Sequence, residues 1–148
     1  MHLDDTSKRL IELLQADGRA PYATLAQEVR LSEAAVRHRV LKMLDEGVMQ
    51  IVAVTDPLKL GFAREAMIGI TTTADAREVA AAVAAIEEID YVMITSGRFD
   101  IMAELVAESD DELLEIVSGR VRALPGIGTI ETMVYLRLVK QTYSWGVR

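Results

Sequence analysis

Apolar residues recur at helical spacing through the first 47 residues, and at strand and helical spacing in alternation after residue 60. The first part predicts three helices: one that Asp4 or Asp5 caps, one over about residues 22–29, and one that Ser32 caps and Gly47 ends. Because a turn of only three or four residues separates the last two, this part predicts a helix-turn-helix.

The segment that follows the third helix is dominated by apolar and β-branched residues. Residues 48–55 read VMQIVAVT, a composition that favours an extended strand. Asp56-Pro57 then gives a turn signal. The sequence therefore predicts a winged helix-turn-helix domain over residues 1–55 and a linker over residues 56–63.

The remainder follows the order β-α-β-β-α-β. Helix caps stand at Asp75 and Ser109, and strand-like stretches begin near Ala66, Tyr91, Phe99 and Ile130. This order predicts an α+β chain whose second domain, residues 64–140, is ferredoxin-like, followed by a tail over residues 141–148.

A sheet of this kind carries both helices on one face. We expect the uncovered face to be apolar and to join copies of the chain by two-fold symmetry. The residues expected on it are Ile68, Ile70, Met93 or Ile101, and Val134.

The residue counts exclude several classes of site. The chain has no Cys and only two His, at positions 2 and 38, which excludes disulfide scaffolds, thiol catalysis and Cys-ligated zinc. No apolar run approaches the roughly 20 residues of a membrane span, and the N-terminus lacks the regions of a secretory signal. We expect no metal, no cofactor, no catalytic residue, no membrane association and a cytoplasmic location.

Charge is distributed unevenly along the chain. The 16 basic and 23 acidic residues give a net charge of −7, which argues against nucleic-acid binding for the chain as a whole. Within residues 30–42, however, Arg30, Arg37, Arg39 and Lys42 oppose Glu33 alone. This local basic face is compatible with a small footprint on DNA.

The third predicted helix orients these cations. Val36 and Val40 mark its buried side, so Arg37, His38 and Lys42 point outward, whereas Arg39 lies between the two sides and suits either a phosphate or a partner within the domain. An ordinary solvated helix face is the alternative. The candidate DNA contacts are Ser32, Ala34, Arg37, His38, Arg39 and Lys42.

Six stretches resemble, in order, landmarks of the Lrp/AsnC (feast/famine) transcription regulators, from Leu3 to about Lys140. They include Leu25-Ala26 through Leu31-Ser32, Glu46-Gly47-Val48, Asp56 to Gly61, Ser96 to Asp100, and Leu124 to Ile127. The resemblance implies a DNA-binding transcription factor that dimerises through its C-terminal sheet and often forms tetramers or octamers. It also implies a small effector, usually an amino acid, bound where dimers meet. Arg30 and Pro21 depart from the pattern, since the family favours Gly or Asn in the turn and a Ser or Thr cap.

The stretch from Ser96 to Asp100 is either a plain hairpin turn or a ligand site. The resemblance favours the ligand role: backbone N–H groups near Gly97 would hold a carboxylate, and Asp100 would accept from an ammonium group. Phe99 is expected to pack in the core. The candidate effector residues are Ser96, Gly97, Arg98, Asp100, Thr129 and Thr132, the last two with ordinary strand polarity as the alternative.

These observations predict a sequence-specific DNA-binding regulator that responds to a small effector. Its partners would be double-stranded DNA, an amino acid and further copies of the chain. The alternatives are a DNA-compacting architectural protein and an enzyme resembling haem-pathway decarboxylases, although residues 61–148 contain no His. Tyr135, Tyr143 and Trp145 would either form a stacking platform or pack the tail or a subunit interface.

Overall fold

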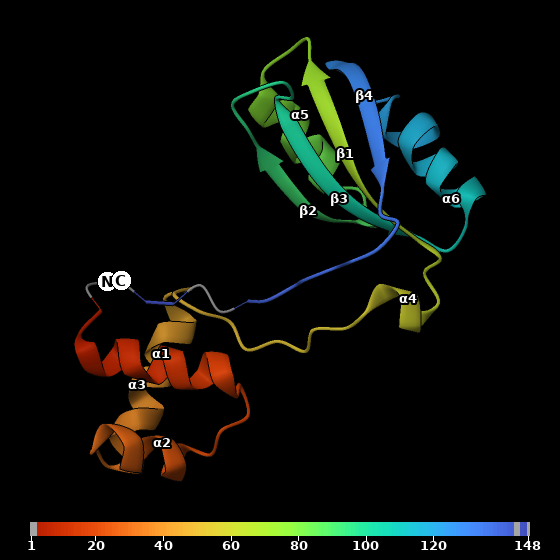
Figure 1. Cartoon of the computed structure of the whole chain (residues 1–148). Helices are drawn as coiled ribbons and strands as arrows, with labels where there is room; N and C mark the ends of the chain where they lie inside the picture. The colour runs from red at the N-terminus through yellow and green to blue at the C-terminus, as the bar shows by residue number, and fades with distance from the viewer. Residues whose placement is uncertain (1–2, 144–145, 148) are drawn as a thin grey trace. The chain divides into compact units, whose positions relative to one another are not determined.

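The computed structural model describes residues 3–143 and 146–147. The chain folds into two compact units (Figure 1). The first runs to Val54 and takes in the segment from Lys140 onward, and the second spans Thr55–Val139. His2 and Trp145, both considered above, lie outside the described residues.

Three helices form the N-terminal unit: α1 (Asp5–Ala16), α2 (Tyr22–Val29) and α3 (Glu33–Asp45). Side chains cap the N-termini of α1 and α3. Asp4 Oδ1 accepts from Ser7 N at 2.8 Å, and Ser32 Oγ accepts from Ala35 N at 3.2 Å. The apolar stripes meet in a core that includes Leu10, Leu14, Leu25, Val36, Val40 and Met43. The predicted helix-turn-helix is confirmed.

Both departures in the turn region have a local structural consequence. Arg30 adopts φ 56°, ψ 44°, the left-handed conformation that Gly or Asn occupies at lower cost. Pro21 stands immediately before α2 as its N-cap and gives it no side-chain cap. The fold tolerates both residues.

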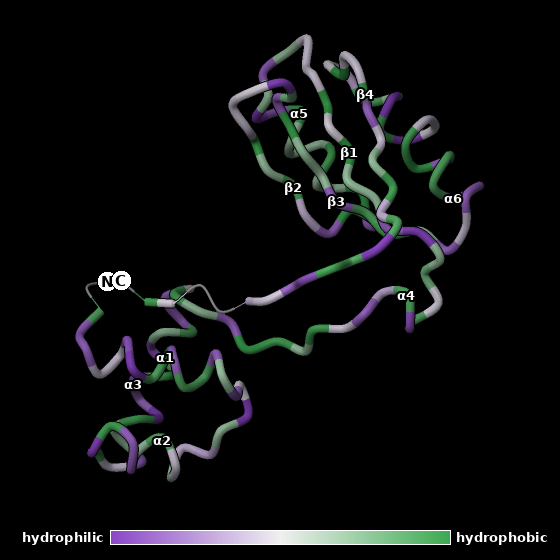
Figure 2. The backbone as a smooth tube through the Cα atoms, in the orientation of Figure 1, coloured by the Kyte–Doolittle hydropathy of each residue, from purple (hydrophilic) through white to green (hydrophobic). Residues whose placement is uncertain are grey.

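Residues 48–55 form no strand within the described chain, so the expected wing is wrong. The β-branched composition favours extended backbone, but a strand also needs a partner to satisfy its backbone groups. Val52 and Val54 are 67% and 56% exposed. Figure 2 shows a hydrophobic stretch of chain before α4 (Pro57–Leu60).

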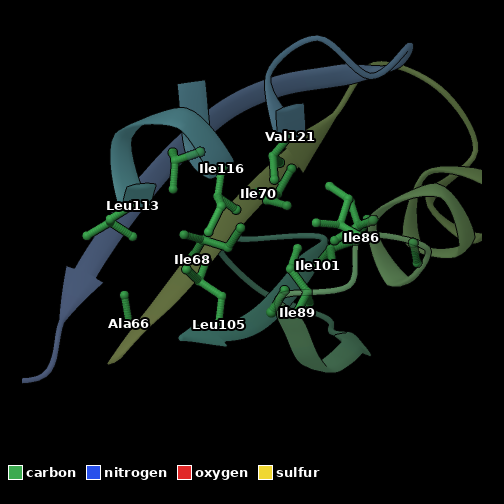
Figure 3. Packing of buried hydrophobic residues seen from close by; sticks show 14 of the residues in the cluster. Ala66, Ile68, Ile70, Ile86, Ile89, Ile101, Leu105, Leu113, Ile116 and Val121 are labelled. Atoms are coloured by element: carbon green, nitrogen blue, oxygen red, sulfur yellow. The ribbon is translucent and has the colours of Figure 1, made fainter. Parts of the chain in front are cut away.

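The C-terminal unit has the predicted β-α-β-β-α-β order. Its elements are β1 (Arg64–Thr72), α5 (Ala76–Ala84), β2 (Ile89–Ile94), β3 (Ile101–Ala107), α6 (Asp110–Leu114) with a π-helical continuation (Glu115–Val121), and β4 (Ile127–Val134). The strands form one antiparallel sheet in the order β2-β3-β1-β4. One core joins both helices to one face of this sheet (Figure 3).

The expected composition of the uncovered face is mostly wrong. Ile68, Ile70 and Ile101 are fully buried under the helices, and Val134 pairs with Ala66 on that same side. Because side chains alternate along a strand, the opposite face carries the residues between them. Each strand contributes one methionine to it: Met67, Met93, Met102 and Met133. We call this set the methionine face.

Polar groups accompany the methionine face. Tyr135 donates its hydroxyl to Glu104 Oε1 at 2.7 Å, and partial burial together with this carboxylate raises the pKa of Tyr135. Burial also raises the pKa of Glu65, which the charges of Glu104 and Asp56 reinforce. The uncovered face therefore combines soft apolar side chains with partly desolvated carboxylates.

Candidate DNA-binding helix and effector site

The burial of α3 follows the predicted orientation. Val36 and Val40 are fully buried, whereas Ser32, Ala34, Arg37, His38 and Lys42 are exposed. Five of the six candidate DNA contacts therefore lie on the surface of the second helix of the helix-turn-helix.

Arg39 takes the other orientation that the sequence allowed. Its Nη1 donates to Asp4 Oδ2 at 2.7 Å and to Ser7 Oγ at 3.2 Å, and so ties α3 to the beginning of α1. Hydrogen bonds from Ser7, and then the Arg39 guanidinium, lower the pKa of Asp4 to about 2. Arg39 thus has a structural role within the domain.

The depressed pKa of Asp4 predicts a pH dependence. Its contribution to stability is complete above the unfolded-state pKa of 3.8 and is lost as the pH falls through about 2. We expect Asp4→Asn, which keeps a capping oxygen but removes the charge, to flatten the acid dependence of the free energy of unfolding between pH 5 and 2. Urea titrations at several pH values measure this. An unchanged acid limb would contradict the ion pair.

The remaining cations of α3 make weak surface contacts. Arg37 Nη2 lies 3.9 Å from Glu33 Oε1, and Lys42 Nζ lies 3.7 Å from Glu46 Oε1. Exposed pairs of this kind contribute only about 0–1 kcal/mol. Both cations can therefore exchange these partners for phosphate or base acceptors.

The turn between β2 and β3 folds back onto the sheet. Thr95 Oγ1 donates to the Phe99 carbonyl at 2.6 Å, and the Asp100 amide donates to the Ile70 carbonyl at 2.9 Å. Phe99 covers Gly69 on the methionine face rather than entering the helix-covered core as expected: a Cβ on Gly69 would lie 2.5 Å from the ring. A glycine inside a strand often marks such a close approach, so Gly69 is the residue from which the contact with Phe99 could have been predicted.

Asp100 is engaged within the fold. Its Oδ2 accepts from the Thr72 amide at 2.7 Å and from Thr72 Oγ1 at 3.3 Å. The carboxylate therefore fastens the turn to β1. Ser96 and Gly97 are exposed, and a Cβ on Gly97 would meet only open space.

One candidate effector residue, Arg98, contacts a carboxylate that the sequence analysis did not single out. Arg98 pairs with Glu131 of β4, reaching across β1. Thr129 lies on the same face of β4 and shares a 2.8 Å hydroxyl contact with Thr71. Thr132 pairs with Ile68 and so points to the opposite face, away from the other candidates.

A hollow of about 570 Å³ lies elsewhere in the C-terminal unit. Three carboxylates line it, from Glu87, Glu88 and Asp90, beside apolar groups such as Leu60 and Phe62. A ligand carboxylate would meet like charges there, so the turn from Ser96 to Asp100 is the better candidate for an amino acid.

No cluster of three or more His, Cys, Asp or Glu suited to a metal ion occurs in residues 3–143 and 146–147. Over the same part of the chain, every helix is too short or too polar to cross a membrane.

Family models match most of the chain. An AsnC-type helix-turn-helix domain matches residues 3–44, and an Lrp/AsnC ligand-binding domain matches residues 65–145. An uncharacterised HTH-type transcriptional regulator of Pyrococcus furiosus is 33% identical, with 96% of this chain and 97% of the relative covered. The HTH-type transcriptional regulator FL11 of Pyrococcus horikoshii is 30% identical, with 95% and 93% covered.

Solved structures share the fold. Escherichia coli AsnC superposes with a TM-score of 0.84 at 23% identity, covering 97% of this chain and 98% of that one. A Neisseria meningitidis transcriptional regulator in complex with L-Met gives 0.83 at 24% identity, covering 97% and 96%. The helix-turn-helix, the four-stranded sheet and the two matching domain models agree, and the chain belongs to the Lrp/AsnC family of transcription regulators.

Proposed function

We propose that this regulator acts in the cytoplasm, reads DNA through the exposed side of α3 and responds to an α-amino acid bound at the β2–β3 turn. The observation that carries the DNA contact is the pattern of exposed polar groups and cations on α3 above its buried side. The contacts would come from Ser32, Ala34, Arg37, His38 and Lys42. Arg and Lys at such positions can reach guanine acceptors or phosphates.

The ion pair between Arg98 and Glu131 supports the effector site. An α-amino acid carries both charges, so its carboxylate could replace Glu131 at the guanidinium while its ammonium group replaces Arg98 at the carboxylate. Arg98 is 75% exposed and can turn toward a ligand. The relative solved with L-Met gives a precedent for an amino acid in this family.

Calorimetry tests the effector site. The twenty amino acids are screened first by thermal shift, since a ligand at 100 times its Kd adds about 2.7 kcal/mol of stability. For an amino acid found in that screen, we expect Arg98→Ala to reduce the affinity at least tenfold, because a charge-assisted hydrogen bond contributes about 1.5–3 kcal/mol.

Arg77→Ala serves as the control, since Arg77 is a cation in the helix layer. It should bind like the parent. Equal affinities of Arg98→Ala and the parent would place the effector elsewhere.

We also propose that two copies of the chain cover each other's methionine face. With helices on one side only, the sheet leaves its four methionines uncovered beside the carboxylate of Glu65, and two-fold symmetry lets this surface bind its own copy. Methionine side chains adapt well to such contacts. The assembly would carry two copies of α3 and so read two half-sites.

Two alternatives predict different outcomes. An architectural protein would coat DNA without a limited footprint, whereas a regulator protects a short phased site. The enzyme alternative lacks support from the C-terminal unit, because residues 61–148 hold no His and an excess of acidic residues. Footprinting separates the first two functions, and a haem-binding titration addresses the third.

A further inference from the structure

Tyr22, the first residue of α2, lies beneath the side chain of Arg37. The Arg37 Cζ atom is 5.2 Å from the centroid of the Tyr22 ring, within the distance of a cation–π contact. The ring is half-buried and packs against the core of the helical unit. The fold therefore holds the Tyr22 ring in place, while the Arg37 side chain is 60% exposed.

This contact differs from those of the neighbouring cations. Arg39 uses an N–H group to bind Asp4 and Ser7, so that donor is occupied within the domain. A cation–π contact at this distance requires no hydrogen bond from the guanidinium, so its N–H groups stay available as donors. The contact of Arg37 with Glu33 is long, at 3.9 Å, and does not occupy a donor firmly.

We infer that Tyr22 is a positioning residue for DNA recognition, acting through Arg37. This inference rests on the proposed role of Arg37 as a DNA contact. A long side chain loses rotamer freedom when it binds, and ordering it beforehand lowers that cost. The Tyr22 ring orders the Arg37 side chain before DNA binds. In this way α2 contributes to DNA recognition by α3 without itself contacting a base.

A double-mutant cycle tests this inference. The probe is a duplex selected from a random-sequence pool by the unaltered full-length chain. We expect Tyr22→Leu, which keeps an apolar side chain in the packing, to weaken binding about two- to fivefold, as an exposed cation–π contact would. Tyr22→Phe keeps the ring and should bind like the parent. In an Arg37→Ala background, Tyr22→Leu should have no further effect.

The salt dependence gives a second readout. If Arg37 contacts a phosphate, Arg37→Ala lowers the salt slope by about one, whereas Tyr22→Leu leaves it unchanged because the contact persists. Urea unfolding of each variant establishes that it is folded at the assay temperature. If Tyr22→Leu does not fold, Tyr22→Met replaces it in the cycle.

Four results would overturn the inference. Equal weakening by Tyr22→Leu in both backgrounds would make its effect independent of Arg37. Loss of affinity in Tyr22→Phe would assign the effect to the hydroxyl. If Tyr22→Leu binds DNA like the parent while Arg37→Ala binds more weakly, Arg37 contacts DNA but the Tyr22 ring does not position it. Parent-like binding by Arg37→Ala would instead remove the DNA contact of Arg37, and this inference with it.

Discussion

Met67→Glu is expected to convert the protein from an oligomer to a folded monomer at micromolar concentration. Met67 lies on β1 at the middle of the methionine face, where it pairs with Glu104 on one side and Met133 on the other. In a two-fold assembly the substitution places two extra carboxylates in the contact, and each uncompensated buried charge costs several kcal/mol. Every 1.4 kcal/mol changes the dissociation constant tenfold.

Size-exclusion chromatography with light scattering measures this effect. Met67→Leu is the matched control, because it conserves volume and costs less than about 1.5 kcal/mol. It should remain an oligomer. Circular dichroism establishes that the Glu variant is folded. A Met67→Glu chain with the parent's mass in solution would exclude the methionine face as the contact between copies.

Arg37→Ala is expected to weaken binding to a selected duplex by about 1–3 kcal/mol if the guanidinium reads a base. The effect should be confined to one base position, where sequence preference flattens. A phosphate contact would weaken all sequences alike. Arg37 lies on the exposed side of α3, opposite the buried Val36 and Val40.

Fluorescence anisotropy with the selected duplex and single-base variants measures these affinities. Arg9→Ala is the control, because Arg9 lies on α1 and is a cation paired with Glu12 and Glu28. It should bind DNA like the parent. If Arg37→Ala also binds like the parent, the proposed orientation of α3 on DNA is wrong.

The helical part of the fold could be predicted closely because its signals are local. Asp4 and Ser32 cap their helices as the sequence indicated, since a short polar side chain can satisfy free amides at a helix start. Nothing local predicts the positive φ of Arg30; only the resemblance indicates a turn position that favours Gly or Asn. The role of Arg39 could not be chosen, because its partner Asp4 lies 35 residues away in sequence.

The alternation of side chains along a strand does not show which face of the sheet the helices cover. Both sides of β1 are apolar, with Ile68 and Ile70 on one and Met67 and Gly69 on the other, so alternation alone did not identify the covered side. The larger β-branched side lies under the helices. The prediction of a wing was wrong for a related reason. Residues 48–55 have the composition of a strand but pair with no other strand within the described chain.

The candidate effector site was only partly predictable. The turn itself follows from the local sequence, but its attachment to Thr72 and the reach of Arg98 to Glu131 depend on the strand order β2-β3-β1-β4. Glu131 was therefore missed. Thr132 lies on the other face from Thr129, because side chains alternate along a strand.

We propose that this chain reads specific DNA as a symmetric assembly. In vitro selection from a random-sequence pool with the full-length chain, followed by sequencing, tests it most directly. We predict an enriched, two-fold symmetric motif with half-sites separated by one helical turn or a multiple of it. A pool that shows no enriched motif after repeated rounds would contradict sequence-specific binding by this chain.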